Sequence, residues 1–545
     1  MIDVALAYAA VQGSMLAGLF KARARLRHYL LSPLVAAPLT AVSAIGAVAV
    51  GAVLTNVGLG AHGLVESGIA MGMGVLLGFA GGNADARASS DDKSHQRGSL
   101  VESRPAPSRA RFHGPTRDRG ITLAGMAIPL RDETKHFKMI GTTGTGKSTA
   151  IEEILSGALA RGDRAVIADP DGGYLRRFYR PERGDIVLNP FDARSVKWDL
   201  FGEIKTGYDV DQLARSLIPD HEGQDRSWRA YARTFFTAVT RQAHDAGTKG
   251  VEELFRLLVV AETSELRELV RGTAAQPFLD EHNSRMFDSI RSVTSSAVAA
   301  LEYIGRQEAE GFSVREWVKR KTPGVIFIPY KAGQIAALRA PISAWMRLAI
   351  FQTMDQSEPA EADPGEGGDR LWFVVDELDA LGQIDGLKDA LARLRKFGGR
   401  CVLGFQSIAQ VSSTYGQGDA HTIVENCGNT LILRCSSSEG GGTARFASQL
   451  IGEREVLHTT VSKSRRPTDF FSSISHSEHR SVEPAVLASQ VEQLADLDGY
   501  LKYASDRTWK RVRLDAKSAW ERHRQAGADV RHPGAEHEEG DCVRG

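Results

Sequence analysis

Basic segments and long uncharged apolar segments alternate over the first 84 residues. No Lys, Arg, Asp or Glu occurs between Arg27 and Glu66, and the Ala-, Val-, Leu- and Ile-rich part of this stretch, residues 34–54, is long enough for a helix that spans a bilayer. A second uncharged stretch, residues 67–84, follows a short turn that contains Gly and Asn. The pattern therefore predicts a membrane anchor over residues 1–84, built as a hairpin of two transmembrane helices.

Basic residues flank both ends of this predicted hairpin. Four precede the first apolar stretch and three follow the second: Lys21, Arg23, Arg25, Arg27, Arg87, Lys93 and Arg97. Because basic residues concentrate on the cytoplasmic side of membrane proteins, both ends of the hairpin are predicted to be cytoplasmic and the turn external. The alternative is a pair of buried core helices, although core helices normally carry a polar face.

The segments around the hairpin have other compositions. Residues 4–20 are apolar, but Gln12, Gly13 and Ser14 interrupt them, so we interpret this stretch as an amphipathic helix at the membrane surface. Residues 85–119 are rich in Ser, Pro, Arg and Asp, which predicts a basic linker that contacts either anionic lipid or DNA. Residues 516–545 are polar and charged, a composition typical of a disordered tail.

From residue 120 onward, short apolar runs alternate with segments of helical periodicity. This alternation predicts an α/β fold with a doubly wound, mainly parallel sheet. The predicted strands cover residues 137–140, 165–168, 186–188, 325–328, 371–375, 400–405 and 430–433. Residues 201–317 are mostly helical by pattern, so we expect an all-α domain inserted into an α/β domain that comprises residues 120–200 and 318–515.

The strand predicted at residues 137–140 runs into a complete phosphate-binding loop of the pattern G-x-x-x-x-G-K-S. The loop and the position after it comprise Gly141, Thr142, Thr143, Gly144, Thr145, Gly146, Lys147, Ser148 and Thr149. The glycines allow backbone N–H groups to surround phosphates, Lys147 can reach the outer phosphates, and Ser148 can ligate Mg²⁺. A helix is predicted to follow and to point its N-terminus at the phosphates. The sequence therefore predicts a site for ATP and Mg²⁺.

Two later strands end in polar residues that suit the same site. The strand at residues 371–375 is followed by Asp376 and Glu377; an Asp in this place holds Mg²⁺ through water, and the Glu can activate the attacking water. The strand at residues 400–405 is followed by Gln406, which either senses the γ-phosphate or simply ends the strand. Together with an intact phosphate loop, these residues indicate an ATPase.

A helix is expected between these two strands, and its C-terminal end is basic. The basic residues are Arg393, Arg395 and Lys396. They either complement the helix dipole or supply an arginine to the nucleotide of a neighbouring subunit.

Several short segments resemble those of the type IV secretion coupling proteins, most closely the TrwB/TraD group of plasmid conjugation. The resemblance covers roughly residues 119–513 and rests on these blocks: Gly141–Thr149, Asp169–Gly172, Leu188–Asp192, Val375–Leu378, Arg395–Gly398 and Gly404–Val411. It implies a RecA-like P-loop NTPase domain with an inserted all-α domain and two transmembrane helices in each subunit. It also implies a homo-hexameric ring in the bacterial inner membrane, with the bulk of the protein in the cytoplasm.

The resemblance also implies roles for residues at matching positions. Lys147 and Ser148 would bind phosphate and Mg²⁺, while Asp376 and Glu377 would ligate the metal and catalyse hydrolysis. Gln406 would couple hydrolysis to movement, and Arg395 would act as an arginine finger across the subunit interface. The implied partners are single-stranded DNA with its relaxase and relaxosome, inner-membrane components of the type IV secretion channel, and membrane lipid.

Composition restricts the possible functions further. The formal net charge is zero, so any DNA site must be local, and the four cysteines lack both CxxC and zinc-ligand spacing, so reduced thiols are expected. A DNA-dependent ATPase that pumps single-stranded DNA during conjugation accounts for the anchor and the motifs together. The alternatives are a docking receptor whose ATP binding mainly stabilises the ring, and a chromosome-type translocase of double-stranded DNA.

Overall fold

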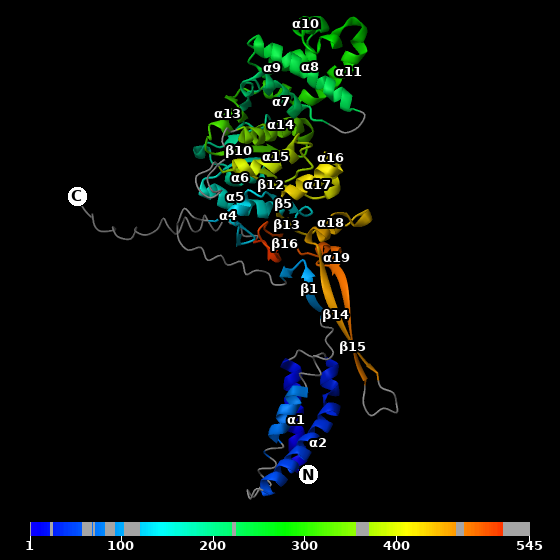
Figure 1. Cartoon of the computed structure of the whole chain (residues 1–545). Helices are drawn as coiled ribbons and strands as arrows, with labels where there is room; N and C mark the ends of the chain where they lie inside the picture. The colour runs from blue at the N-terminus through cyan, green and yellow to red at the C-terminus, as the bar shows by residue number, and fades with distance from the viewer. Residues whose placement is uncertain are drawn as a thin grey trace, which may run out of the picture. The chain divides into compact units, whose positions relative to one another are not determined.

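The structure, a computed structural model, describes the greater part of the chain. The described parts are residues 2–21, 26–56, 68, 71–81, 93–102, 120–220, 225–355, 370–464 and 473–515. The chain divides into two compact units, one comprising Met1–Gly98 with Arg454–Glu483 and the other Ser99–Glu453 with Pro484–Gly545. The second unit contains every predicted nucleotide-binding motif (Figure 1).

A ten-stranded sheet forms the centre of the second unit. Its strands, in spatial order, are β2 (Val101–Glu102), β17 (Trp509–Arg513), β16 (Asp498–Lys502), β13 (Asn429–Ile432), β5 (Phe137–Ile140), β12 (Gly399–Phe405), β11 (Leu371–Val375), β6 (Arg164–Pro170), β10 (Val325–Tyr330) and β7 (Ile186–Val187). Neighbouring strands from β13 to β7 pair in parallel, which confirms the predicted mainly parallel sheet. The antiparallel pairs of β16 with β13 and with β17 were not predicted.

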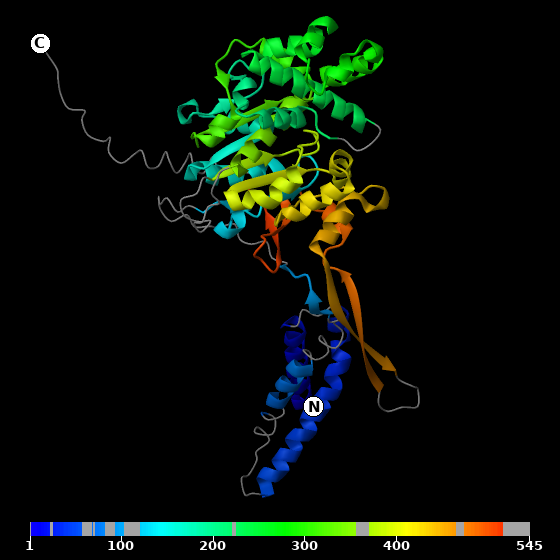
Figure 2. The same cartoon turned by 45° about the horizontal axis from the view of Figure 1, so that its top comes forward.

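Helices cover both faces of this sheet (Figure 2). Successive residues of β11 alternate between two apolar cores: Trp372 and Val374 pack in one with Ile151 of α5 (Lys147–Arg161), and Phe373 packs in the other with Trp345 of α14 (Ile335–Met354). A strand that is buried on both faces needs a continuous apolar run, which is why the sequence pattern located β11 correctly.

The order of the strands brings the predicted site residues together. Strand β12 lies between β5, which leads into the phosphate loop, and β11, which leads into Asp376. Since the three strands are parallel, their carboxyl ends meet at one edge of the sheet. Ligands of open α/β sheets bind at such an edge.

Between β7 and β10 the chain is mostly helical, as the periodicity of residues 201–317 predicts. The α-helices are α7 (Gly207–Leu217), α8 (Arg226–Asp245), α9 (Val251–Phe255), α10 (Thr263–Leu269), α11 (Ser284–Val298), α12 (Ala300–Gly305) and α13 (Val314–Lys319). A two-stranded pair, β8 (Lys197–Trp198) with β9 (Gly311–Phe312), joins the two ends of this stretch. The helices that follow the sheet strands elsewhere are α4 (Leu130–Glu133), α6 (Gly173–Phe178), α15 (Leu387–Leu394), α16 (Ile408–Tyr415), α17 (Gln417–Asn426), α18 (Gly442–Ile451) and α19 (Ala488–Glu492).

The described residues of the first unit include three apolar helices. They are α1 (Ile2–Lys21), α2 (Leu26–Asn56) and a shorter helix, Met71–Gly81. Among the described residues one segment, His28–Ala49 of α2, is long and apolar enough to cross a membrane, and it overlaps the first predicted span. The described part of the second predicted span is Met71–Gly81.

Strands also occur where the sequence analysis did not expect them. Residues 85–119 were expected to be a linker, but β1 (Lys93–Gly98) pairs antiparallel with β14 (Glu453–Ser464), and β2 joins the large sheet. Strands β14 and β15 (Ser473–Pro484), 12 residues each, were not predicted. The described parts of β1 and β15 are polar and mainly exposed, and that of β14 is mostly half-buried, so none of the three shows the apolar alternation by which strands are recognised. The expected tail at residues 516–545 lies outside the described residues.

A buried network of charges fixes the edge of the sheet opposite the phosphate loop. Arg161 donates two hydrogen bonds of 2.8 Å to the carboxylate of Glu133, and Arg400 donates another of 2.9 Å to the same carboxylate. Asp163 accepts from Arg161 and from the indole N–H of Trp372. The Glu133 and Arg400 side chains are only 1% and 2% exposed, so each charge depends on its partners.

His136, beside this network, makes the stability of the fold depend on pH. Burial, together with the nearby charges of Arg400 and Arg395, lowers its pKa from 6.5 to about 4. Its Nδ1 accepts a hydrogen bond from the Cys401 N–H, so the folded protein holds a neutral ring. The unfolded chain binds a proton below pH 6.5 and the folded chain does not, so stability should fall by up to about 1.4 kcal/mol for each pH unit between pH 6.5 and about 4.

We expect His136→Asn to reduce this pH dependence. Asparagine can still accept the hydrogen bond from Cys401, and it tolerates the positive φ of 55° at this position. Thermal unfolding of the detergent-solubilised protein at pH 7.5 and 5.5 measures the effect, with the exposed His421→Asn as the matched control. Equal losses of stability on acidification in wild type and His136→Asn would contradict the assignment.

Candidate nucleotide site

The phosphate loop connects β5 to α5, and the C-terminal part of the chain holds it in place. Gly144 and Gly146 have φ values of +77° and +116°, which suit glycine. A Cβ on Gly146 would lie 2.9 Å from the side chains of both Leu497 and Leu514. The N–H of Leu497 donates a 3.0 Å hydrogen bond to the carbonyl of Thr145. This support was not predicted, because it joins segments that lie far apart in the sequence.

Lys147, the first residue of α5, points back into the loop. Its ammonium donates hydrogen bonds of 2.7 Å to the carbonyl of Gly141 and 3.2 Å to that of Thr142. Burial lowers its pKa, and Asp376 and Glu377 oppose that shift because their charges favour the ammonium. The ammonium is therefore enclosed by the loop and by acidic groups, where phosphate oxygens could replace the carbonyl partners.

Asp376 is the centre of the site. Its Oδ2 accepts two hydrogen bonds of 2.7 Å, one from the Ser148 hydroxyl and one from the Tyr174 hydroxyl. Its Oδ1 is buried and has no hydrogen-bond partner among the described residues. A carboxyl oxygen that is buried without a donor suits a metal ion or a water of its coordination shell, so Ser148 and Asp376 fit Mg²⁺.

Asp169, Asp171 and Gly172 lie at the turn that connects β6 to α6. Asp169 ends β6 and accepts hydrogen bonds from the backbone N–H groups of Tyr174 (3.1 Å) and Leu175 (2.7 Å). Asp171 and Gly172 turn the chain with φ values of 57° and 67°. Burial raises the pKa of Asp169 to about 6, although these hydrogen bonds oppose the shift. The turn thereby positions Tyr174 against Asp376, a contact that the sequence analysis did not predict.

Glu377 and Gln406 lie beside the loop, as predicted. The Gln406 side-chain N–H donates a 3.2 Å hydrogen bond to Glu377, and its Oε1 accepts one of 2.8 Å from the Thr143 hydroxyl. Burial raises the pKa of Glu377, and the charges of Asp376 and Asp379 raise it further. A carboxylate with a raised pKa is a stronger base, which suits the activation of water.

Arg395 does not lie near these residues within one chain. It is exposed and precedes β12, whereas Gln406 follows β12, so the two residues lie at opposite edges of the sheet. A strand of seven residues is about 23 Å long. Arg395 therefore does not contact the nucleotide site of its own chain. Thr149, also predicted to bind, lies in the first turn of α5.

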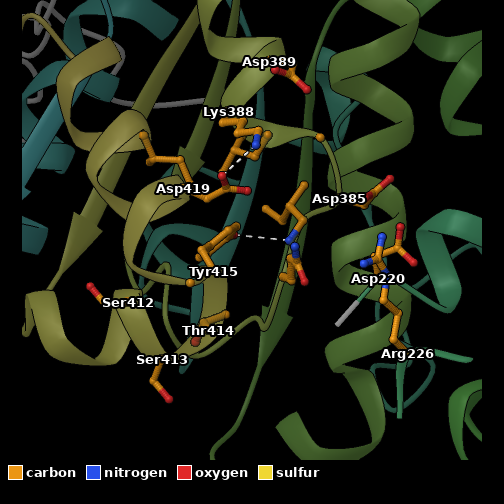
Figure 3. A pocket seen from close by; sticks show the side chains of 16 residues that line it. Asp220, Arg226, Asp385, Lys388, Asp389, Ser412, Ser413, Thr414, Tyr415 and Asp419 are labelled. Carbon is orange, nitrogen blue, oxygen red and sulfur yellow. Dashed lines mark hydrogen bonds and ion pairs between the residues drawn. The ribbon is translucent and has the colours of Figure 1, made fainter. Parts of the chain in front are cut away.

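Residues 382–384, which follow Glu377 in the chain, make hydrogen bonds with α16, the helix that follows Gln406. Tyr415, at the end of α16, donates a 3.3 Å hydrogen bond to the carbonyl of Gly382 and accepts one of 3.3 Å from the Ile384 N–H. Figure 3 shows Tyr415 at the side of a cavity of about 560 Å³, opposite Asp220 and Arg226. Residues 382–384 and α16 are thus linked through Tyr415.

The comparison with known families agrees with this geometry. Residues 120–515 match the family described as "Type IV secretion-system coupling protein DNA-binding domain". The chain therefore belongs to the type IV secretion-system coupling proteins. This coupling protein is 30% identical over 391 residues to the coupling protein TraD of Escherichia coli (strain K12), which covers 71% of this chain and 53% of TraD. The chain thus spans about half the length of that curated relative.

Solved structures of the plasmid coupling protein TrwB are similar to this coupling protein. The plasmid coupling protein TrwB in complex with ADP and Mg²⁺ is 29% identical, with a TM-score of 0.67, and the match covers 79% of this chain and 96% of that one. TrwB in complex with the ATP analogue ADPNP is also 29% identical, with a TM-score of 0.65 and coverages of 78% and 95%. The family thus includes proteins that bind adenine nucleotides, with Mg²⁺ in one of these complexes.

Proposed function

We propose that this coupling protein is a membrane-anchored, DNA-dependent ATPase that assembles as a homo-hexamer. It links the relaxase-bound single-stranded DNA of a relaxosome to inner-membrane components of a type IV secretion channel, and it pumps the DNA during conjugation. The observation that carries this proposal is the convergence of Lys147, Ser148, Asp376 and Glu377 at one edge of the sheet, with the unpartnered Oδ1 of Asp376 among them. A scaffold that only binds nucleotide does not require a base with a raised pKa in this place.

ATP supplies the phosphoanhydride bond to be hydrolysed, and Mg²⁺ supplies positive charge on its phosphates. Lys147 would exchange its carbonyl partners for phosphate oxygens, and Ser148 and Asp376 would hold the metal. Tyr174 would keep Asp376 oriented through its hydrogen bond to Oδ2. Glu377 would take the proton of the attacking water, since its raised pKa makes it a better base than an ordinary glutamate.

Gln406 would connect hydrolysis to movement. It bridges Thr143 of the phosphate loop and Glu377, and it directly precedes α16. Through Tyr415 the same helix holds residues 382–384. A change in the contacts of Gln406 would therefore shift α16 together with the segment after Glu377, and this is a route by which the helical surface could move DNA.

The rest of the chain would serve assembly and location. Residues 201–317 would form the inserted all-α domain, and the apolar helices of residues 1–84 would anchor the protein in the bacterial inner membrane, in contact with lipid. Arg395, exposed at the edge opposite the phosphate loop, would act as an arginine finger at the nucleotide of the adjacent subunit. Each complete site would then need two chains.

The test is ATP hydrolysis by the detergent-solubilised full chain, with and without single-stranded DNA. We expect stimulation by DNA, loss of hydrolysis in Arg395→Ala and in Glu377→Gln, and partial recovery when the two variants are mixed. In random mixed rings roughly a quarter of the interfaces would combine an intact Glu377 with an intact Arg395 from the neighbour. Nucleotide binding without any response to DNA would overturn the pump and favour the docking receptor. A failure of the mixture to recover would contradict the action of Arg395 across the interface.

A further inference from the structure

The three apolar helices of the first unit pack closely against one another. A Cβ on Gly78 would lie 2.4 Å from the carbonyl oxygen of Val11 in α1, and one on Gly74 would lie 2.8 Å from the Val11 side chain. A Cβ on Gly46 of α2 would likewise lie 2.8 Å from Met73. Glycines that allow backbones to approach in this way are typical of helix interfaces within membranes.

The contacts also fix the directions of the helices. Residues 73 and 81 of the third helix approach residues 46 and 39 of α2, so these two helices run antiparallel. Residues 74 and 78 of the third helix approach residues 7 to 14 of α1, in rising order, so the third helix and α1 run parallel. Helix α1 also packs alongside α2, with Val11, Met15 and Ala36 in one small core.

The polar residues of α1 face its neighbours. The Gln12 side-chain N–H donates a 2.7 Å hydrogen bond to the hydroxyl of Ser32 in α2, while its Oε1 is buried without a hydrogen-bond partner among the described residues. The Ser14 hydroxyl donates a 3.0 Å hydrogen bond to the carbonyl of Val11 within α1, and it would lie 2.2 Å from a Cβ on Gly78 of the third helix. Large apolar side chains point outward instead; Phe20 is 77% exposed and Leu34 is 73% exposed. A bundle that turns its amide and hydroxyl groups inward and its Phe and Leu side chains outward is suited to lipid.

This arrangement explains why α1 is not recognised from length and composition. Gln12, Gly13 and Ser14 lower its average hydropathy, and the sequence analysis therefore placed it at the membrane surface. In the bundle, however, Gln12 donates to Ser32 of α2 and Ser14 lies against Gly78 of the third helix, so neither side chain is directed toward lipid. The 20 residues of α1 are about 30 Å long, which matches the hydrocarbon thickness of a bilayer.

We propose that α1 is a third membrane-spanning helix, with Lys21 at the cytoplasmic face and Ile2 at the opposite face. The direction follows from the third helix, which leads back toward the cytoplasmic nucleotide domain and to which α1 is parallel. The basic residues 21–27 then form the cytoplasmic turn between α1 and α2, in agreement with their charge. The chain thus reaches the far side of the membrane at Ile2 as well as between α2 and the third helix, so channel components on that side can meet it at two places. This inference rests on the proposed membrane anchor.

Cysteine accessibility in cells tests the topology. The full-length variants Asp3→Cys, Arg23→Cys and Asn56→Cys are treated with a small membrane-impermeant maleimide before and after lysis. We expect Asp3→Cys and Asn56→Cys to react in intact cells, and Arg23→Cys to react only after lysis. Wild type reports the background of the native cysteines, of which Cys401, Cys427 and Cys435 are free and buried. Ile2→Cys is a second reporter if Asp3→Cys is not inserted.

The possible results distinguish the proposal of a third membrane span from the proposal of a membrane anchor. Reaction of Asn56→Cys in intact cells, with Asp3→Cys and Ile2→Cys reacting only after lysis, would overturn the third span and restore the two-helix hairpin with a surface helix. Protection of Asn56→Cys as well, in protein that reacts after lysis, would overturn the membrane anchor itself and the inference with it.

Discussion

Replacing Glu377 with glutamine is expected to lower the rate constant of ATP hydrolysis by about 10²–10⁴-fold, the range typical for removal of a general base. Glutamine keeps the shape of the side chain and can still contact Gln406, but it cannot accept the proton of the attacking water. Nucleotide binding should persist, because Lys147 and Ser148 are unchanged. Single-turnover hydrolysis and equilibrium binding of a fluorescent nucleotide measure the two effects separately.

The pH profile gives this prediction a second readout. Burial and the charges of Asp376 and Asp379 raise the pKa of Glu377, so hydrolysis by the wild type should decline on the acidic side at a pH above the ordinary range of a glutamate. That decline should vanish in the residual activity of Glu377→Gln. Asp389→Asn, an exposed carboxylate of α15, is the matched control and should retain wild-type rates. If Glu377→Gln hydrolyses ATP at a rate within threefold of wild type, Glu377 is not the general base.

The residues of the site that could be predicted share one physical property. The phosphate loop, Asp376 and Gln406 each follow a buried apolar strand, and the carboxyl ends of parallel strands meet at one edge. Recognising the strands was therefore sufficient to place these residues together. The strands were recognisable because burial on both faces requires nearly unbroken apolar runs, such as residues 371–375.

The residues that escaped prediction act through contacts between distant segments. Tyr174 reaches Asp376 only because Asp169 and the turn at Gly172 position α6, and Leu497 supports Gly146 from the far end of the chain. Nothing in the sequence distinguishes a tyrosine or leucine that supports a site from one that only packs in the core. The dipeptide Asp171-Gly172 after β6 is the sequence signal that could have indicated this turn, and both residues do have left-handed φ values in the structure.

The polar strands and the first helix were missed for a related reason. The described parts of β1 and β15 are polar and mainly exposed, and that of β14 is mostly half-buried, so the three strands present no apolar alternation, and β1 was included in a linker. In α1 the polar residues Gln12 and Ser14 are turned toward protein partners. Periodicity reveals which residues avoid water, but it does not reveal which neighbour covers a polar group.

Replacing Glu133 with glutamine should destabilise the nucleotide-binding unit by about 3–5 kcal/mol, the usual cost of breaking a buried ion pair from one side. The change leaves the guanidinium groups of Arg161 and Arg400 buried without their shared carboxylate. Burial opposes ionisation of Glu133, but the hydrogen bond from Arg161 and the charge of Arg400 outweigh it, so its pKa in the folded state is lowered. This contribution is present above the unfolded-state pKa and is lost as the pH falls through the folded-state pKa.

Denaturant unfolding of the detergent-solubilised protein at pH 7, followed by tryptophan fluorescence, measures this loss of stability. Trp372 is a suitable reporter because its indole N–H donates to Asp163 of the same network. Glu302→Gln breaks an ion pair with Arg306 whose side chains are 40% and 72% exposed, so this matched control should cost less than about 1 kcal/mol. Equal losses in the two variants would show that the Glu133 network does not stabilise the edge of the sheet. A large loss confined to Glu133→Gln would show that this edge depends on buried charge, even though the rest of the sheet is held by apolar packing.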